Sequence, residues 1–324
     1  MNIVILDGQV LNPGDNPWDA FEALGHVTVY DRTPPELVLE RSQGAQALIT
    51  NKTRLDAATI AALPDLRYIG MLATGYDVVD IAAAAARGIP VCNVVAYGVD
   101  AVAEHVLALM LDLCRGIGLH SDSVRAGDWS RAPDWCYWLM PQRDLAGMTM
   151  GVVGFGNIGR RVGELAHAFG MTVLAYNRSP LRSPSYSPFS FVGLDALFAQ
   201  ADVISLHCPL NDASRGMVNA ARLATMKPGA LLINTARGLL LDEAAVAAAL
   251  HSGHLGGFGA DVLAKEPPDT DNPLLSAPNS RITPHVSWAT LKARRNIVRL
   301  AAENLRAFAD GAPRNVVNAA LMQA

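Results

Sequence analysis

Cysteine and aromatic residues are scarce in this chain of 324 residues, which has four cysteines and 6% aromatic residues. The cysteines never form a C-x-x-C pair, so neither a disulfide framework nor a zinc knuckle is predicted, and buried thiols are expected. They are Cys92, Cys114, Cys136 and Cys208. His251 and His254 lie close together, but no Cys or Glu stands at ligand spacing. We therefore expect no metal site.

Long apolar runs and runs of one charge sign are also missing. No uncharged stretch reaches the roughly 18 apolar residues that a bilayer span requires. The residues Met1–Asp7 carry no basic region, so we expect a first strand there rather than a secretion signal, and a cytoplasmic protein. The 30 acidic and 26 basic residues are interspersed and sum to a net charge of -4, which argues against nucleic acid as a partner.

The length predicts two domains. Short β-branched runs alternate with helical stretches over the first hundred residues, which is typical of a parallel sheet covered on both faces. Predicted strands are Ile3–Leu6, Val27–Tyr30, Ala47–Thr50, Tyr68–Leu72 and Val91–Val94. Predicted helices are Trp18–Leu24, Pro35–Arg41, Asp56–Leu63 and Val79–Arg87.

The middle and end of the chain show three further patterns. An Ala- and Leu-rich helix is predicted over residues 100–119, buried between layers. Residues 121–145 read as an irregular loop with Trp129, Trp135 and Trp138, either held against the core by its rings or forming a subunit contact or a wall of the site. A second α/β series spans 148–285, and a closing amphipathic helix at 290–309 is expected to pack on the first series.

A glycine-rich turn, Gly154-Phe155-Gly156-Asn157-Ile158-Gly159, follows the strand Met150–Val153 and precedes a helical pattern. This strand, turn and helix form the context of a dinucleotide-binding fingerprint. Gly154 allows the sharp turn, Gly156 lets backbone N–H groups approach a diphosphate, and Gly159 lets the helix lie close to the strand. The diphosphate would lie at the positive end of the helix.

The residues after the next strand, Thr172–Tyr176, select the cofactor. Enzymes that prefer NAD usually carry an acid there, which binds the ribose hydroxyls and repels a 2′-phosphate. This chain has Asn177, Arg178 and Ser179. The neutral amide removes the repulsion and the guanidinium can pair with phosphate, so the sequence favours NADP, with NAD possible if Arg178 points into solvent.

Three later strands end in polar residues suited to hydride transfer: Arg237, Glu266 and His285. Ligands of parallel sheets lie beyond the carboxyl ends of the strands, where all three are predicted to meet. Arg237 can hold a carboxylate through two parallel hydrogen bonds. His285 can donate and accept a proton near neutral pH, and Glu266 can orient its imidazole. Each residue alone is typical of structural roles, and their coincidence predicts catalysis.

The sequence resembles the D-isomer-specific 2-hydroxyacid dehydrogenase family, and within it the glycerate dehydrogenase and hydroxypyruvate or glyoxylate reductase branch. The resemblance covers nearly the whole chain. It is carried by Leu72–Asp80, Val102–His105, Leu145–Thr149, the glycine turn, His207–Leu210, Thr235–Gly238, Asp261–Val262 with Glu266–Pro267, and Pro284–His285.

The resemblance implies an α/β fold of two Rossmann-like domains with parallel sheets. A discontinuous, flavodoxin-like substrate domain would comprise residues 1–99 and 291–324, with an NAD(P)-binding Rossmann domain inserted at 100–290. It also implies an oxidoreductase that acts on a 2-keto or D-2-hydroxy acid and forms a homodimer through the cofactor domain.

The resemblance further implies the site residues. The catalytic ones would be Arg237, Glu266 and His285. The substrate would contact Asn51 or Lys52, the backbone of Ala73, Thr74 and Gly75, and the side chains of Arg237, His285 and Trp288. The size of Trp288 would narrow the substrate pocket. The cofactor would contact Thr74, the six residues of the glycine turn, Asn177, Arg178, Ser179, His207, Cys208, Pro209, Thr235, Ala236, Arg237, Asp261 and His285.

Two alternatives stay open at this point. A formate dehydrogenase shares the architecture, but formate needs no proton donor, so Glu266 opposes that reading. Some relatives are corepressors that sense NAD(H) and bind peptides, but this sequence has little length beyond an enzyme core. The complete set of site residues favours the enzyme.

Overall fold

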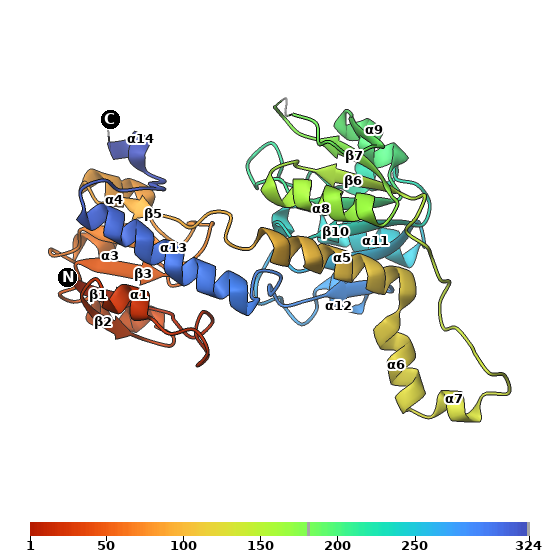
Figure 1. Cartoon of the computed structure of the whole chain (residues 1–324), viewed down its shortest axis with the longest axis horizontal. Coiled ribbons are helices and arrows are strands. Elements are labelled where there is room, and N and C mark those ends of the chain that lie inside the picture. Colours follow the sequence, from red (N-terminus) through yellow and green to blue (C-terminus); the bar gives the residue numbers. More distant parts are fainter. Residues whose placement is uncertain (180–181, 323–324) are drawn as a thin grey trace. The chain divides into compact units, whose positions relative to one another are not determined.

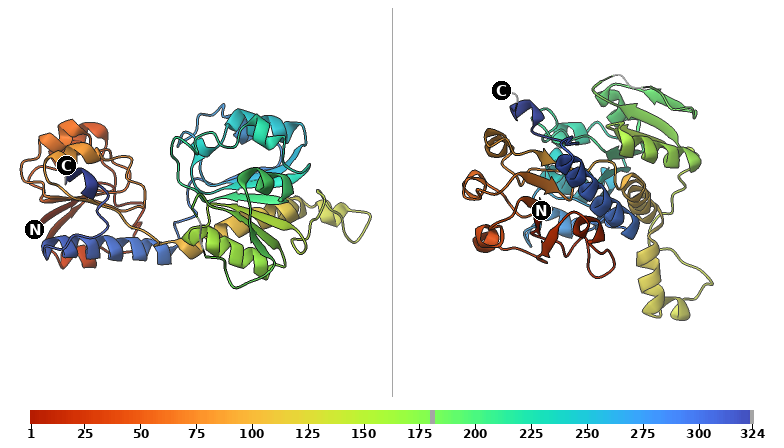
Figure 2. Two further views of the ribbon diagram at one scale, coloured as in Figure 1. Left: turned by 90° about the horizontal axis from the view of Figure 1, so that it is seen from above. Right: turned by 60° about the vertical axis from the view of Figure 1, so that its left-hand side comes forward.

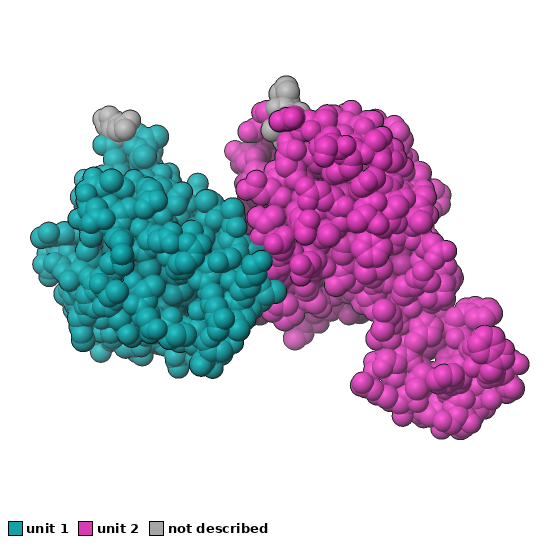
Figure 3. Space-filling view, in the orientation of Figure 1, with its two compact units in different colours: residues 1–98, 289–324 teal, residues 99–288 magenta. Residues whose placement is uncertain are grey.

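The computed structural model describes residues 1–179 and 182–322, which divide into two compact units (Figures 1 and 3). Unit 1 comprises residues 1–98 and 289–324, and unit 2 comprises residues 99–288. Unit 1 is therefore discontinuous and unit 2 is inserted in it. Each unit holds one parallel sheet, which confirms the predicted fold class.

The sheet of unit 1 has the strand order β2-β1-β3-β4-β5, with every neighbouring pair parallel. Its strands are β1 (Asn2–Ile5), β2 (His26–Val29), β3 (Ala47–Thr50), β4 (Tyr68–Met71) and β5 (Val91–Cys92). Alternate side chains point to opposite faces, so Val4 and Leu48 enter one buried cluster and Ile3 and Ile5 the opposite face. The order is that of flavodoxin-like sheets.

Helices cover both faces of this sheet. They are α1 (Asp19–Glu22), η1 (Pro35–Leu37), α2 (Val38–Arg41), α3 (Ala57–Ala61), α4 (Ile81–Ala86), α13 (Leu291–Ala309) and α14 (Ala319–Met322). The long helix α13 packs on β4, where the Phe308 and Tyr68 rings lie 5.0 Å apart. The closing helix therefore returns to the first series, as expected.

The sheet of unit 2 has seven parallel strands in the order β12-β11-β10-β9-β6-β7-β8. They are β6 (Thr149–Val153), β7 (Thr172–Tyr176), β8 (Phe189–Phe191), β9 (Val203–Leu206), β10 (Ala230–Asn234), β11 (Leu255–Ala260) and β12 (Ser280–Ile282). Because all strands run the same way, their carboxyl ends share one edge. That edge is where open parallel sheets bind ligands.

Helices cover both faces of this sheet (Figure 2), and each face carries one buried apolar cluster. On one face lie α5 (Val99–Arg115) and α8 (Asn157–Ala168), which pack on each other. On the other lie α9 (Leu194–Gln200), α10 (Ala220–Leu223), η2 (Gly238–Leu240), α11 (Glu243–His251) and α12 (Pro273–Ser276). Nine residues of α5 are buried, as expected for a helix between layers.

Residues 116–145 differ from the expectation. The helix α5 ends at Arg115 because Gly116 adopts a left-handed φ of +54°, and two further helices follow, α6 (Ile117–Arg125) and α7 (Asp128–Arg131). These helices extend away from the rest of unit 2 (Figure 1). Of the alternatives for the tryptophan rings, packing on the core is wrong. Trp129, Trp135 and Trp138 are 53%, 85% and 71% exposed.

Two of the four cysteines are buried and two are not. Cys92 and Cys114 are buried as expected, whereas Cys136 is exposed and Cys208 partly exposed, so the expectation was wrong for these two. Cys136 lies in the same projecting segment as the tryptophans. No helix within residues 1–179 and 182–322 combines the length and apolar character that crossing a membrane requires.

Candidate active site

The glycine turn between β6 and α8 is packed on two sides and open on a third. Gly154 has a left-handed φ of +93°, and a Cβ there would collide with the backbone of His207 and Cys208. A Cβ at Gly159 would collide with the carbonyl oxygen of Gly154. At Gly156, by contrast, a Cβ would meet nothing within 4 Å. The backbone is therefore accessible at Gly156.

The start of α8 suits a phosphate group. The N-cap residue is Gly156, and no side chain caps the helix. The first N–H groups of a helix have no partner inside it, and they carry partial positive charge. After β10, at the same carboxyl edge of the sheet, the buried Thr235 hydroxyl has no hydrogen-bond partner among the described residues. These features fit a dinucleotide, whose diphosphate would occupy the helix start.

Asn177 connects this turn to the loop after β7. Its Oδ1 accepts a hydrogen bond from the Phe155 N–H at 3.2 Å, and its Nδ2 donates to the Ser179 carbonyl oxygen at 2.9 Å. Arg178 and Ser179 are exposed. The amide thus holds the backbone beside the exposed Arg178. Sequence reasoning treated Asn177 only as a missing acid and did not foresee this bridge.

The Phe155 side chain is fully buried. It packs against Phe189 and Phe191 at centroid distances of 5.1 and 5.5 Å, and the Arg160 guanidinium lies 5.0 Å from its ring centre. Only the backbone of Phe155 is therefore available to a ligand. The ring serves to anchor the turn on the β7–β8 side of the sheet.

His285 and Glu266 form a hydrogen-bonded pair beyond β12 and β11. His285 Nδ1 lies 2.6 Å from Glu266 Oε2, and Glu266 Oε1 accepts from the Leu263 N–H at 3.1 Å. Both side chains are about one-third exposed, at 32% and 35%. The pair leaves Nε2 as the imidazole atom that can reach a substrate. Sequence reasoning anticipated this contact.

Arg237 follows β10 and is partly buried. Its Nη1 donates to the Ala236 carbonyl oxygen at 2.7 Å, and its own carbonyl accepts from Asn234 Nδ2 at 2.8 Å. The next residue, Gly238, packs so tightly that a Cβ would collide with the backbone of Leu263 and Ala264. The turn that carries Arg237 therefore contacts the loop that leads to Glu266.

Glu243 is a residue of this region that sequence reasoning missed. It lies in the first turn of α11, and its Oε1 accepts from the Ala264 N–H at 2.7 Å. Its Oε2 accepts from Asn272 Nδ2 at 2.9 Å. Glu243 thus holds the loop before Glu266. A glutamate at a helix start is usually explained by its favourable charge near the helix dipole, so no sequence pattern indicates this role.

The segment His207-Cys208-Pro209 follows β9 and touches the glycine turn. His207 Nε2 lies 2.8 Å from Ser205 Oγ. The ring keeps some exposure, but the protein around it desolvates the charged form and lowers the pKa of His207 to about 3. His207 is thus neutral near pH 7. Cys208 Sγ lies 3.7 Å from Met217 Sδ, and burial raises the pKa of its thiol.

Asp261 and Trp288 both contact the turn at His285. Asp261 is 1% exposed and accepts hydrogen bonds from the Val286 and Ser287 N–H groups, each at 2.8 Å. The Trp288 indole N–H donates to the His285 carbonyl oxygen at 2.8 Å. Trp288 therefore lies against the His285 backbone, close to where the resemblance places the substrate.

The remaining predicted substrate residues lie in unit 1. Asn51 and Lys52 follow β3, and their N–H groups, with that of Thr53, donate to the Asp7 carboxylate at 2.5 to 2.8 Å. Thr74 follows β4, and its hydroxyl donates to the Val94 carbonyl oxygen at 2.7 Å. Its neighbours Ala73 and Gly75 are partly exposed. Asp7 was not anticipated from the sequence.

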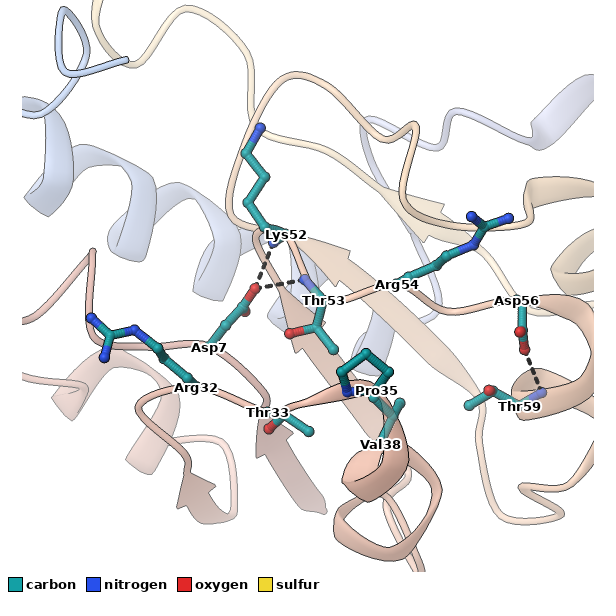
Figure 4. Close-up of a pocket in the computed structure, with 10 residues that line it drawn as sticks. All are labelled: Asp7, Arg32, Thr33, Pro35, Val38, Lys52, Thr53, Arg54, Asp56 and Thr59. Atoms are coloured by element: carbon teal, nitrogen blue, oxygen red, sulfur yellow. Dashed lines mark hydrogen bonds between the residues drawn. The ribbon is translucent and has the colours of Figure 1, made fainter. Parts of the chain in front are cut away.

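A pocket of about 450 Å³ opens beside this segment (Figure 4). Arg32, Lys52 and Arg54 stand around it with their charged ends directed outward, while Asp7 and Thr53 lie deeper (Figure 4). Two carboxylates, Asp7 and Asp56, also line the pocket, so its three cations leave an excess of one positive charge.

Comparisons with known proteins place the chain. Residues 107–287 match the sequence model of the D-isomer specific 2-hydroxyacid dehydrogenase NAD-binding domain. A hydroxypyruvate reductase of Blautia hydrogenotrophica is 44% identical over 321 residues, covering 98% of this chain and 100% of the relative. A glycerate dehydrogenase of Methylorubrum extorquens is 44% identical over 287 residues, covering 88% and 89%.

Among solved structures, an acyclic imino acid reductase in complex with NADPH and D-Arg superposes with a TM-score of 0.83 at 29% identity, covering 98% of this chain and 100% of that one. The matched region coincides with most of unit 2, which identifies a nicotinamide cofactor as its ligand. The chain belongs to the D-isomer-specific 2-hydroxyacid dehydrogenase family, in its glycerate dehydrogenase and hydroxypyruvate reductase branch, and is an oxidoreductase.

Proposed function

We propose that this enzyme interconverts a small 2-keto acid, such as hydroxypyruvate or glyoxylate, and the corresponding D-2-hydroxy acid. The observation that carries the proposal is the 2.6 Å contact between His285 Nδ1 and Glu266 Oε2 at the carboxyl edge of the unit 2 sheet. The carboxylate holds the imidazole through Nδ1, so Nε2 is the atom from which a proton can be delivered to a carbonyl oxygen during reduction. The names of the two relatives support the same substrates.

Each remaining side chain has a role in this proposal. Arg237 binds the substrate carboxylate and polarises the adjacent carbonyl. In unit 1, Asn51 or Lys52 and the backbone of residues 73–75 are the substrate contacts of this proposal, and in unit 2 Trp288 limits the size of the substituent. When bound, the nicotinamide cofactor supplies the hydride. His285 Nε2 then delivers a proton to the carbonyl oxygen, and in oxidation it receives the proton back.

The cofactor is held, in this proposal, by the glycine turn, Asn177–Ser179, His207–Pro209, Thr235, Ala236 and Asp261. We propose a preference for NADPH. Arg178 is exposed beside the neutral Asn177, whose two hydrogen bonds fix the backbone on either side. An exposed guanidinium at that position offers two parallel hydrogen bonds to a 2′-phosphate, and residue 177 is not a carboxylate that would repel it.

A substrate panel tests the activity. Hydroxypyruvate, glyoxylate, pyruvate and phenylpyruvate are each offered with NADPH or NADH, and oxidation of the cofactor is followed at its absorbance maximum. We expect turnover of hydroxypyruvate, of glyoxylate or of both, with a higher kcat/KM for NADPH than for NADH. Turnover of none of the four would instead favour a protein that senses NAD(H) without catalysis.

We also propose that the protein is a homodimer joined through unit 2. The segment that carries α6 and α7 exposes Trp129, Trp135 and Trp138, and Ile117 is 66% exposed as well. Figure 3 shows this segment standing out from the magenta unit. Large exposed aromatic and aliphatic side chains in one segment mark an interaction surface. A second copy of the chain offers the same aromatic surface in return.

A further inference from the structure

A buried carboxylate fixes the backbone on one side of His285. Asp261, directly after β11, is 1% exposed. Its Oδ1 accepts from the Val286 N–H at 2.8 Å and from the Thr283 hydroxyl at 2.6 Å, and its Oδ2 accepts from the Ser287 N–H at 2.8 Å. Buried carboxylates are stable only when donors satisfy them in this way. The two backbone donors follow His285, and the hydroxyl donor, Thr283, precedes it.

The direction of the hydrogen bonds extends the chain of contacts to α5. A carboxylate can only accept hydrogen bonds, so the Thr283 hydroxyl donates its hydrogen bond to Asp261. His105 Nε2 lies 2.9 Å from Thr283 Oγ1 and must then be the donor. The alternative acceptor for the Thr283 hydroxyl, the Ala260 carbonyl oxygen, is farther away at 3.4 Å. The order is therefore His105 to Thr283 to Asp261.

The backbone that this relay holds is strained. His285 has a φ of +56°, a left-handed value that side-chain-bearing residues rarely adopt. The His285 N–H donates to the Thr283 carbonyl oxygen at 2.9 Å, so Thr283 constrains the turn through its backbone as well. Asp261 constrains the following two residues. Such strain persists only where the surroundings determine the conformation.

We propose that His105 and Thr283 are positioning residues for the proton donor. This inference rests on the proposed role of His285. The relay His105–Thr283–Asp261 keeps the turn left-handed and orients the imidazole so that Nδ1 contacts Glu266 and Nε2 faces the substrate. Neither residue needs to contact substrate or cofactor. The short motif Val102–His105, which sequence analysis noted without assigning a function, contains the first member of the relay.

Four single variants of the full-length enzyme test the relay. Thr283→Val removes the hydroxyl and keeps the shape, whereas Thr283→Ser keeps the hydroxyl. His105→Leu removes the donor, whereas His105→Gln keeps an N–H donor. A displacement of about 1 Å at the reacting group can cost about 100-fold in rate, so we expect Thr283→Val and His105→Leu to lower kcat at least about 10-fold. Thr283→Ser and His105→Gln should restore most of that loss.

Three further measurements separate positioning from folding. The dissociation constant for NADPH should stay within about twofold in all variants, because the relay acts on His285 rather than on the glycine turn. The solvent deuterium isotope effect on kcat should increase in Thr283→Val, as proton delivery becomes slower. The double variant His105→Leu/Thr283→Val should be no worse than the poorer single variant, because residues of one network are not additive.

Each outcome decides the question. Unchanged kcat in Thr283→Val overturns the relay, and so do additive losses accompanied by lower thermal stability but no change in the isotope effect. These results leave the proposed function intact, provided that His285→Ala is inactive in the same assay. If His285→Ala keeps its activity, the proton-donor role fails, and the relay fails with it.

Discussion

At the scale of single residues, His285 is the most direct test of the proposed chemistry. Replacement by alanine removes the imidazole that delivers the proton, so kcat for keto-acid reduction should fall by about 10²- to 10⁴-fold. Dinucleotide binding should change by less than about twofold, since the glycine turn and the start of α8 are untouched. Steady-state kinetics and a fluorescence titration with NADPH measure the two effects.

The matched control is His251→Ala. His251 lies in the last turn of α11 and is exposed, so its loss should leave kcat unchanged. A His285→Ala variant as active as His251→Ala would contradict the proposed mechanism.

Asn177 tests the cofactor preference. In Asn177→Asp, one carboxylate oxygen can still accept from the Phe155 N–H, but the other faces the Ser179 carbonyl oxygen that the amide now donates to. The new charge repels a 2′-phosphate and can bind ribose hydroxyls. One to two kcal/mol of such discrimination corresponds to a fall of about 10-fold in the NADPH:NADH ratio of kcat/KM.

Asn219→Asp provides the control for an added charge in the same unit. Asn219 caps α10 through its side-chain oxygen, a task that aspartate performs equally well. The cofactor ratio should be that of the unmodified enzyme. If Asn177→Asp and Asn219→Asp give the same ratio, the charge at residue 177 does not select the cofactor.

His207 predicts a pH dependence of stability. Its pKa is about 3 in the folded chain against an ordinary value of 6.5, so between these values the unfolded chain binds a proton that the folded chain does not. The contribution of neutral His207 to the free energy of unfolding is therefore fully present above pH 6.5. It is lost as the pH falls from there, by at most about 1.4 kcal/mol per pH unit. His207→Gln should make this loss shallower.

Urea unfolding at several pH values from about 4 to about 7 measures the slope of the unfolding free energy against pH, within the window and just above it. His26→Gln, an exposed position in β2, should leave the slope unchanged. A slope that His207→Gln does not reduce would rule out His207 as its source.

At the scale of elements, Gly238 sets the distance between the Arg237 turn and the Glu266 loop. In Gly238→Ala the new methyl group collides with the backbone of Leu263 and Ala264. Forcing atoms into a packed region costs about 1 to 3 kcal/mol, so the melting temperature should drop. Because Leu263 also donates to Glu266, the shift should lower kcat as well.

Gly118→Ala is the matched control for this change. Gly118 lies in α6, and a Cβ there would meet nothing within 4 Å. Alanine is the better helix former, so this variant should be as stable as the unmodified protein or slightly more stable. Equal melting temperatures for the two variants would show that the close approach at Gly238 carries no cost.

The elements also show what a sequence alone can predict. Strands such as Ala47–Thr50 and Thr172–Tyr176 were located correctly because their apolar runs are continuous and bounded by polar or helical segments. The glycine turn was recognisable because strand, turn and helix are adjacent in the sequence. By contrast, the break at Gly116 depends on a left-handed φ that the surrounding helical pattern does not reveal.

Long-range contacts were the least predictable part of the candidate site. Glu266 and His285 could be paired in advance because both follow neighbouring parallel strands and carry complementary chemistry. His105 and Thr283 are 178 residues apart, and both residue types are common in structural positions, so nothing in the sequence linked them. The same holds for Asn177, whose amide partners are backbone atoms that carry no sequence signature.

At the scale of the whole molecule, the proposed homodimer makes the last prediction. Trp135 and Trp138 follow α7 and are 85% and 71% exposed. They carry most of the exposed aromatic surface of residues 116–145, the segment that contains α6 and α7. Buried tryptophans at interfaces typically contribute about 2 kcal/mol or more each, so Trp135→Ser/Trp138→Ser should raise the dimer dissociation constant at least about 100-fold. Sedimentation velocity over a range of protein concentrations measures this.

Leu39→Ser is the control for removing exposed apolar surface elsewhere. Leu39 is 41% exposed on α2 of unit 1, outside the proposed interface, and its replacement should leave the dimer intact. A monomeric unmodified protein would refute the homodimer. A dimer that survives loss of both tryptophans would show that another surface of unit 2, or of unit 1, joins the subunits, because desolvation of these two rings could not then supply the binding energy.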